Sequence, residues 1–392
     1  QSMGAGNTER ARKASGQAVT AVLIVGIFFT VLMTAISGQV PAWMQVEESI
    51  RGMASRYFLI LYLPMLFRAA NIIFGTVLRA VGDTKTPMWV GLAMNLINTV
   101  LNFLLIYPSR TMQLGSVSLP MWGAGLGVEG AALASAISYT CGGIAITYCL
   151  WKHKDISPRG QKLKPDMQVL KPCLRVAFPN MLQRFATSLG YVFFASMINS
   201  LGEVSAAAHT IANTVESAFY IPGWGMQTAA ATLAGNALGA KDADRLHGLE
   251  RAILPLEIGL MAVSGGLLFI FAPQLMTLFT KDDQVISLGT TVLRMVAASE
   301  PFYGVPIVLE GILQGVGKTV APFIFNVIGM WCARIAGTFI CTQLLGMGLI
   351  SAWACMIAHN LLLFVLFIVY FTRGTWKPEM LRVKKPRRCK VN

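Results

Sequence analysis

Long apolar runs, separated by short polar segments, follow one another along almost the whole of this 392-residue chain. A helix needs about 20 mainly apolar residues to cross a bilayer, where it satisfies its own backbone groups. We therefore predict ten membrane-spanning helices, with kinks where Pro64 and Pro222 interrupt them. The predicted spans are residues 17–38, 53–76, 86–107, 126–150, 169–199, 206–235, 251–271, 286–311, 320–344 and 348–371.

Part of this pattern occurs twice. The segment VLRAVGDTKTP at residues 77–87 resembles ILQGVGKTVAP at residues 312–322, and Gly82 matches Gly317 at an offset of 235. Two further segments, GAGNTERARKA near the N-terminus and GAKDADRLHGL in mid-chain, keep the same offset. Two separate matches without slippage indicate a duplicated unit. The matched turns fall on the same predicted side of the membrane, so we expect a parallel repeat of two helical lobes about a central cleft.

The basic residues gather at alternate ends of the predicted helices. Of the 32 Lys and Arg residues, 24 fall in the loops and terminal segments of one side, and four fall in the opposite loops. This asymmetry marks the cytoplasmic side, so we place the basic loops and the C-terminal tail in the cytoplasm of a multi-pass protein of the plasma membrane.

The amino-acid composition also indicates a chain that is surrounded by lipid. The chain is 55% hydrophobic and 13% charged, with a mean hydropathy of +0.59, whereas soluble domains carry about 25% charged residues. The net charge of +14 therefore reflects membrane topology, and we expect no nucleic-acid partner.

The predicted helices divide into four before a long basic connection and six after it. We expect an N-terminal lobe over residues 1–150, a cytoplasmic linker over 151–168, a C-terminal lobe over 169–371 and a basic tail over 372–392. Equal lobes would need twelve spans, so we expect an N-terminally truncated chain that holds about ten of them. A native start codon just before Gln1 would contradict this expectation.

Three asparagines share one face of the span over residues 86–107. Asn95, Asn98 and Asn102 recur at helical spacing. Their oxygen atoms suit cation coordination, including Na⁺ at Asn98 and Asn102, or hydrogen bonding to a substrate. Hydrogen bonds between neighbouring helices are the structural alternative. The positions 235 residues later are apolar, which favours a role specific to the first lobe.

The C-terminal lobe carries ionisable groups inside its predicted spans. We expect Glu216 to be either an exchangeable proton site or one half of a static pair with Arg184 on the neighbouring span. Aromatic and amide side chains follow Glu216 at helical spacing and suit an aromatic or cationic guest. We expect Glu310 to be solvated near the cytoplasmic end of its helix. The candidate substrate-cleft residues are Gln183, Arg184, Tyr220, Gln227, Glu300 and Tyr303.

No constellation of catalytic residues is visible. The seven cysteines have no paired spacing, so we predict neither a disulfide framework nor a zinc site. The GKT sequence at residues 317–319 lacks the glycine framework of a phosphate loop. We therefore expect no enzyme, no ATP-driven pump and no resident cofactor, and we expect a proton or sodium gradient to supply the energy.

Several motifs together resemble the multidrug and toxic compound extrusion (MATE) family. In the first lobe, LRAVGDTKTP is followed by NLINTVLNFLLIY and GVEGAALASAIS. The second lobe contains AAAHTIAN, IPGWGMQTAAATLAGNALGA and LEGILQGVGKTVAPF. The resemblance covers nearly the whole chain. It implies an all-α membrane protein of two six-helix lobes, which exports cationic or amphiphilic compounds against an inward flow of protons or sodium.

The resemblance also implies coupling residues. In similar proteins, a first-lobe cation site uses an aspartate of the first helix and the acid of an NxxxD sequence on the fifth. Here that sequence runs from Asn98 to Asn102 and ends in an amide, while Ser135 matches a hydroxyl position on the sixth helix. These residues match the shape of the site and lack its charge. Other members place an acid in the opening helices of the second lobe, so Glu216 is the preferred coupling residue, and Gln183 stands where some relatives have Glu.

We expect a monomeric secondary antiporter that exports organic cations or drugs by alternating access. One alternative is a flippase for a lipid-linked or polar metabolite, which would have a strongly cationic cleft. The predicted spans contain as many Arg as Glu residues, so cationic or neutral guests are favoured. A second alternative is an inactive, truncated helical bundle.

Overall fold

The computed structural model describes residues 1–44, 46–114, 117–374 and 376, with the backbone alone for residues 111–114 and 117–120. The chain forms two compact units. The N-terminal unit comprises Asn7–Leu170, and the C-terminal unit comprises Lys171–Asn392 together with Gln1–Gly6. The domain limits expected from the sequence remain a prediction, and residues 375 and 377–392 of the expected tail lie outside the described part.

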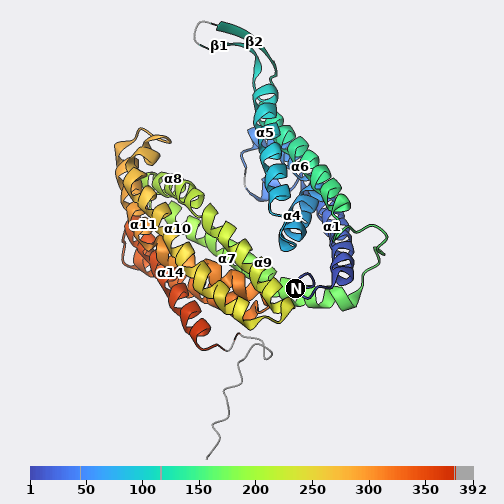
Figure 1. Ribbon diagram of the computed structural model, residues 1–392. Helices are drawn as coiled ribbons and strands as arrows, with labels where there is room; N and C mark the ends of the chain where they lie inside the picture. Colours follow the sequence, from blue (N-terminus) through green and yellow to red (C-terminus); the bar gives the residue numbers. More distant parts are fainter. Residues whose placement is uncertain (45, 115–116, 375, 377–392) are drawn as a thin grey trace, which may run out of the picture. The chain divides into compact units, whose positions relative to one another are not determined.

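The N-terminal unit is a helical bundle organised around its last helix, α6. Helix α6 packs against α3, α4 and α5, and α1 packs against α3 and α4 (Figure 1). Gly143 of α6 permits close approach to α4, because a Cβ there would lie 2.5 Å from the carbonyl oxygen of Phe67. The elements are α1 (Thr8–Ile36), α2 (Val40–Trp43), α3 (Glu48–Tyr62), α4 (Met65–Ala80), α5 (Lys85–Leu105), β1 (Pro108–Leu114), β2 (Val117–Ala124) and α6 (Gly127–Lys152).

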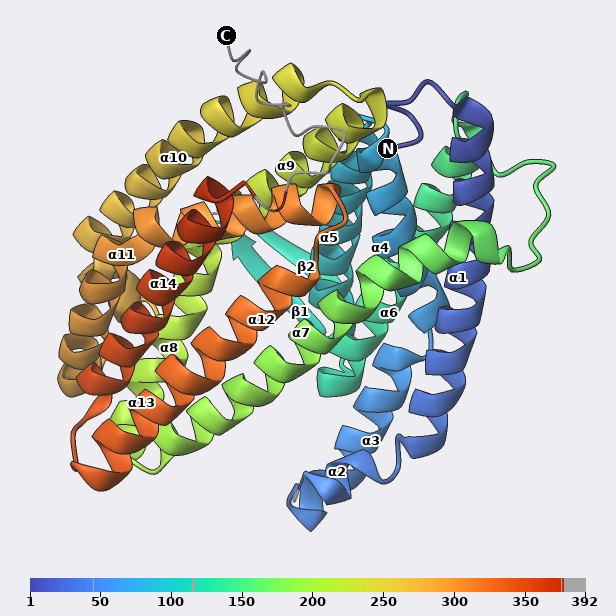
Figure 2. The ribbon, with the colours of Figure 1, turned by 90° about the horizontal axis from the view of Figure 1, so that it is seen from below.

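The C-terminal unit is organised around α11, which packs against α8, α9, α10 and α14. Helix α14 lies between α11 and α12, as Figure 2 shows. The span after α11 is not a regular α-helix, because it contains two π-helical segments, η1 and η2. The elements are α7 (Met167–Asn199), α8 (Glu203–Phe219), α9 (Ile221–Ala240), α10 (Ala243–Thr277), α11 (Asp283–Gly315), α12 (Val320–Ile328), η1 (Gly329–Ile335), α13 (Ala336–Phe339), η2 (Ile340–Leu344) and α14 (Leu349–Thr372).

Helices coincide with all ten predicted spans. Within the described residues, seven helical stretches are long and apolar enough to cross a membrane, and an eighth is the pair α3 and α4, bent by 43° at the predicted kink of Pro64. The remaining two predicted spans are less apolar or are divided. Helix α7 contains three basic residues and two prolines, and the span over 206–235 is split at Tyr220 into α8 and α9.

The predicted repeat is confirmed by the geometry of the matched turns. Gly82, between α4 and α5, has a φ of 89°, and Gly317, between α11 and α12, has a φ of 79°. The amide after each glycine donates to the carbonyl five residues earlier, at 3.1 Å for Asp83 and 2.8 Å for Lys318. This is the Schellman arrangement, which needs a left-handed residue at the end of a helix.

The second matched pair of segments caps equivalent helices in the same way. Asn7 caps α1 and Asp242 caps α10, and each side chain accepts a hydrogen bond from the amide three residues later, at 2.9 and 2.8 Å. The residue before each cap, Gly6 or Lys241, is left-handed, with φ values of 68° and 56°. Both turns were therefore preserved when the two lobes diverged.

The connection between α5 and α6 contains an antiparallel β-hairpin (Figure 1). Strand β1 pairs with β2 from Pro108 opposite Ala124 to Leu114 opposite Val117. At its base, the Arg110 guanidinium lies 4.0 Å from the centre of the Tyr107 ring. No strand is predicted between the spans over residues 86–107 and 126–150, because periodicity alone gives only a weak signal for one short hairpin.

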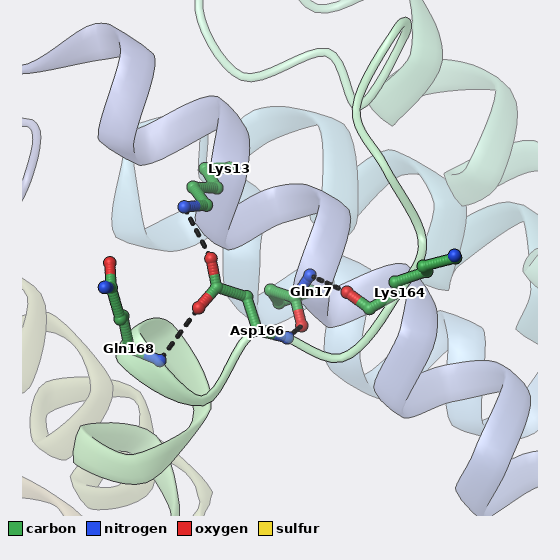
Figure 3. A network of polar contacts seen from close by, with 5 residues as sticks. All are labelled: Lys13, Gln17, Lys164, Asp166 and Gln168. Carbon is green, nitrogen blue, oxygen red and sulfur yellow. Dashed lines mark hydrogen bonds and ion pairs between the residues drawn. The ribbon is translucent and has the colours of Figure 1, made fainter.

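The end of the predicted linker is held against α1 by a polar network (Figure 3). Gln17 of α1 donates to the Lys164 carbonyl oxygen and accepts from the Asp166 amide, both at 2.9 Å. The Asp166 carboxylate forms an ion pair with Lys13 and accepts from the Gln168 amide. The contact with Lys13, together with the Gln168 amide, lowers the pKa of Asp166.

Candidate functional site

A cavity of about 350 Å³ lies within the C-terminal unit. Its wall combines aromatic rings, amides and three charged side chains, from elements between α7 and α14. Mainly apolar pockets with a few convergent polar groups are the usual sites for small molecules. The lining residues are Arg184, Tyr191, Asn213, Glu216, Ser217, Tyr220, Trp224, Tyr303, Arg334, Met356 and Asn360.

Glu216 supplies the acid of this wall. It lies near the end of α8, on the face that also buries Ala212 and Val215, and its side chain is 3% exposed. The Tyr220 hydroxyl donates to Glu216 Oε1 at 2.6 Å. Tyr220 in turn packs edge-to-face on Tyr303 of α11, with the ring centres 5.2 Å apart. The acid is therefore held in place by Tyr220, whose ring packs against α11.

Tyr220 lies at the junction of α8 and α9, one helical turn after Glu216. Tyr220 is the single residue between the two helices, and Pro222 occupies the first turn of α9. Proline fits a first helical turn because its missing N–H would have no partner there. The acid and the hydroxyl lie side by side at the cavity wall because Tyr220 keeps helical backbone angles, with φ of -84° and ψ of -13°, and residues four apart are neighbours on a helix.

Arg334 is the second buried charged residue of the cavity wall. It belongs to η1 and is 4% exposed. Its guanidinium carbon lies 4.4 Å from the centre of the Phe194 ring and 4.9 Å from that of Tyr191. Arg184, by contrast, is exposed. No ion pair joins either arginine to Glu216 in the part of the chain that the structure describes, so the expected pair of Arg184 with Glu216 is absent.

Glu310 is not solvated, contrary to the expectation from its position near the helix end. Its side chain is buried at 9% exposure, and it faces polar side chains of α7 and α12. The carboxylate accepts amide hydrogen bonds from Gln183 and Gln314 at 2.9 and 3.0 Å, and from Asn326 at 3.2 Å. These three amides and Glu310 form what we call the Glu310 network, which joins α7, α11 and α12.

Two further glutamates are fully buried in the C-terminal unit. Among the described residues, neither carboxylate oxygen of Glu257 or Glu300 has a hydrogen-bond partner. Glu257 fits beside Gly304, where a Cβ would lie 3.0 Å from its Oε1. Glu300 fits beside Gly265, where a Cβ would lie 3.0 Å from the Cβ of Glu300.

The candidate substrate-cleft residues therefore separate into two groups. Arg184, Tyr220 and Tyr303 line the cavity together with Glu216. The other three do not line it. Gln183 belongs to the Glu310 network, and Glu300 is fully buried elsewhere. Gln227 is half-buried in α9, and its backbone carbonyl faces Gly311.

Sequence reasoning missed several lining residues. Asn213 lies three residues before Glu216, so helical spacing alone points to the same face of α8. Tyr191 and Asn360 offered no such signal, because their elements reach the cavity only through the packing of α7 and α14.

The first-lobe residues predicted to bind a cation do come together, within the N-terminal unit. Asn98 donates to the Ser135 hydroxyl at 3.3 Å, and Asn102 donates to Asn98 Oδ1 at 3.1 Å. Asn102 Oδ1 is buried without a partner among the described residues. The cluster offers neutral oxygen ligands without a carboxylate, and Asn95 lies outside it with an exposed side chain.

Comparison with known proteins gives consistent results. The sequence profile of the MatE family matches residues 1–104 and 179–340. The chain is 28% identical over 375 residues to the probable multidrug resistance protein NorM of Thermotoga maritima, which covers 96% of this chain and 78% of that protein. It is 25% identical over 303 residues to human multidrug and toxin extrusion protein 1, covering 77% of this chain and 50% of that protein.

Solved structures share the fold. A crystal structure of MATE in the bent conformation superposes with a TM-score of 0.83 at 21% identity, over 95% of this chain and 80% of that one. A transporter of the MOP superfamily from Pyrococcus furiosus gives 0.85 at 22% identity over the same shares. The two-lobe helical fold, the repeated turns and the profile match agree with one another. This multi-pass membrane protein belongs to the multidrug and toxic compound extrusion (MATE) family.

Proposed function

We propose that the chain exports organic cations and drugs from the cell by alternating access, in exchange for protons or sodium. The names of its relatives support extrusion of drugs and toxins. Membership in a family of transporters also supports the expectation that the chain is not an enzyme.

One observation carries the coupling mechanism: the only carboxylate on the cavity wall, among the described residues, is the buried Glu216. An ionised Glu216 balances the charge of a cationic guest, whereas a protonated Glu216 does not. Proton and cation therefore compete for one site, which is the requirement for antiport. The aromatic rings of Tyr220, Trp224 and Tyr303 offer further favourable contacts to a cationic guest.

Sodium is the alternative coupling ion, and its candidate site is the group of Asn98, Asn102 and Ser135, which we call the Asn98 cluster. The free Asn102 Oδ1 and the hydroxyl of Ser135 are the hard oxygen ligands that small cations prefer. Because the cluster carries no charge, it would bind Na⁺ weakly by itself. Sodium coupling through these residues should therefore need high Na⁺ concentrations.

Transport into inverted membrane vesicles tests the proposal. Uptake of a fluorescent aromatic cation should follow an imposed pH gradient, and Glu216→Gln should abolish this uptake. Glu203→Gln is the matched control, since Glu203 is exposed at the start of the same helix. Undiminished uptake by Glu216→Gln would remove Glu216 from the mechanism. Uptake that follows only a sodium gradient, and fails in Asn102→Leu, would move the coupling site to the N-terminal unit.

A further inference from the structure

Two cysteine side chains of the C-terminal unit lie in contact with each other. The Cys355 thiol of α14 donates to the Cys341 sulfur of η2 at 3.9 Å. Both thiols are free and partly exposed. The two residues belong to different elements, so their spacing along the chain gave no signal of a pair. Contact between the thiols, rather than sequence spacing, therefore identifies them as partners.

The backbone around the pair is close enough for the two sulfur atoms to bond. A disulfide requires the sulfur atoms to lie about 2.05 Å apart and the backbones to approach closely. Gly337, one turn before Cys341, brings its helix against α14, because a Cβ there would lie 3.2 Å from the Cys355 sulfur. The Met347 amide donates to the Cys341 carbonyl at 2.9 Å and ties the following turn to η2. Rotation of the two side chains, with a small backbone adjustment, therefore closes the remaining gap.

The pair joins two segments that form walls of the cavity. Arg334 lines the cavity from η1, and Met356 and Asn360 line it from α14. Cys341 follows Arg334 within about two helical turns, and Cys355 directly precedes Met356. The span that carries Arg334 contains the π-helical segments η1 and η2, and such segments are frequent at functional sites. A covalent link at this pair would fix the spacing of the two walls.

We propose that Cys341 and Cys355 form a reversible disulfide that holds η2 to α14 and stops transport. The control of transport rests on the proposed export function, because a guest enters and leaves only if the walls of its site can move. The site itself is a pair of thiols open to oxidation, and it does not depend on which compound is exported.

The oxidant is a peroxide, and the reaction balances in two steps. One thiol attacks a peroxide oxygen, the O–O bond breaks, and a sulfenic acid and water form. The second thiol attacks the sulfenic sulfur, the S–S bond forms, the S–O bond breaks, and a second water leaves. The two thiols lose two electrons and two protons in total, which the peroxide takes up. Dithiothreitol reverses the reaction by thiol–disulfide exchange.

Chemical mapping of the purified wild-type protein in lipid nanodiscs tests the link directly. After treatment with hydrogen peroxide, the remaining thiols are blocked with a maleimide. Trypsin cleaves after Arg334, and cyanogen bromide cleaves after Met347 and Met356, so each of the fragments 335–347 and 348–356 holds one cysteine of the pair. Most of these two fragments should be joined, and dithiothreitol should separate them. Fragments that stay separate after peroxide treatment would overturn the inference.

Uptake by inverted vesicles tests the control of transport. In the wild-type protein, uptake of a fluorescent cation should fall in proportion to the joined fraction and return after dithiothreitol. Cys355→Ser should keep its uptake in peroxide. Cys332→Ser is the matched control, because Cys332 is an exposed cysteine of the same π-helical span, and this variant should lose uptake as the wild type does.

Two outcomes separate this inference from the export function on which it rests. Unchanged uptake by protein whose fragments are joined would overturn the control of transport by the disulfide. Absence of uptake by the reduced wild-type protein would count against the export mechanism, whereas joined fragments would still establish the disulfide.

Discussion

The two units of the molecule share their turns and differ in their buried polar groups. Gly82 and Gly317 end equivalent helices with the same left-handed geometry. The polar cluster of the N-terminal unit, however, consists of half-buried amides and a hydroxyl around Asn98. The C-terminal unit buries glutamates and a guanidinium. Duplication thus preserved the backbone turns that a repeat needs, while the interior chemistry diverged.

The repeat offset shows how far this divergence goes. Residues 235 positions before Glu310 and Asn326 are Gly75 and Gly91, so the N-terminal unit has no counterpart of the Glu310 network. A helix interface in lipid can be built either from small residues in close contact or from polar groups that bond to one another. Only the C-terminal unit uses the polar solution at this place in the repeat, whereas Gly91 has open space around the position of a Cβ.

The largest expected effect tests whether the Glu310 network matters more to stability than the Asn98 cluster. Gln183→Leu leaves the buried Glu310 carboxylate with one donor fewer and should cost about 1–3 kcal/mol of stability. Asn102→Leu should cost about 0.6 kcal/mol, the average for such bonds in membranes. Thermal unfolding in detergent measures both.

A double substitution separates the stability contributed by the hydrogen bond from the cost of burying a Glu310 carboxylate that has lost one donor. Gln183→Leu combined with Glu310→Leu should recover part of the loss, because both partners are then apolar. Equal losses for Gln183→Leu and Asn102→Leu would show that the two clusters contribute alike.

A smaller expected effect tests the left-handed glycine turns that the two units share. Gly82→Ala and Gly317→Ala should each cost about 1–2 kcal/mol, because each places an L-residue in left-handed backbone. The two losses should be similar, since the turns have the same hydrogen bonds. Gly91→Ala is the control: it lies inside α5 with open space at its Cβ, so it should not destabilise. Clearly unequal losses of stability would show that the two turns are not equivalent.

The smallest expected effect concerns the linker of the N-terminal unit and its dependence on pH. The pKa of Asp166 is lowered by Lys13 in the folded state, so the contact contributes stability above the unfolded pKa of about 3.9. That contribution should be lost as pH falls through the lower, folded pKa. Amide hydrogen exchange at Asp166 and Gln168, corrected for intrinsic rates, should rise below about pH 4. In Lys13→Met the same amides should be less protected at neutral pH, and unchanged protection would contradict the role of the ion pair.

Sequence patterns identified the helices and the repeat because both depend on local composition. Twenty apolar residues form a helix in lipid wherever they pack, and a glycine at a left-handed turn is required whatever surrounds it. The Asn98 cluster was found for the same reason, since two of its members follow one another on a single helix face.

Patterns failed where contact between separate elements decides the outcome. Glu310 stands near a helix end, which suggested exposure to water, and it is instead buried in contact with Gln183 of α7 and Asn326 of α12. Asn360 and Tyr191 reach the cavity from α14 and α7, which no spacing within one helix could indicate. The β-hairpin depends on pairing between two strands.

By itself, the sequence determined a duplicated helical membrane protein of the MATE family, with acids and amides inside its spans. Only the tertiary structure decided which of these groups share one cavity, which are enclosed, and that Arg334 lies there without a carboxylate partner among the described residues. The physical reason is the range of the interactions. Helix formation and turn geometry depend on neighbours within a few residues, whereas burial and charge pairing depend on side chains brought together from distant parts of the chain.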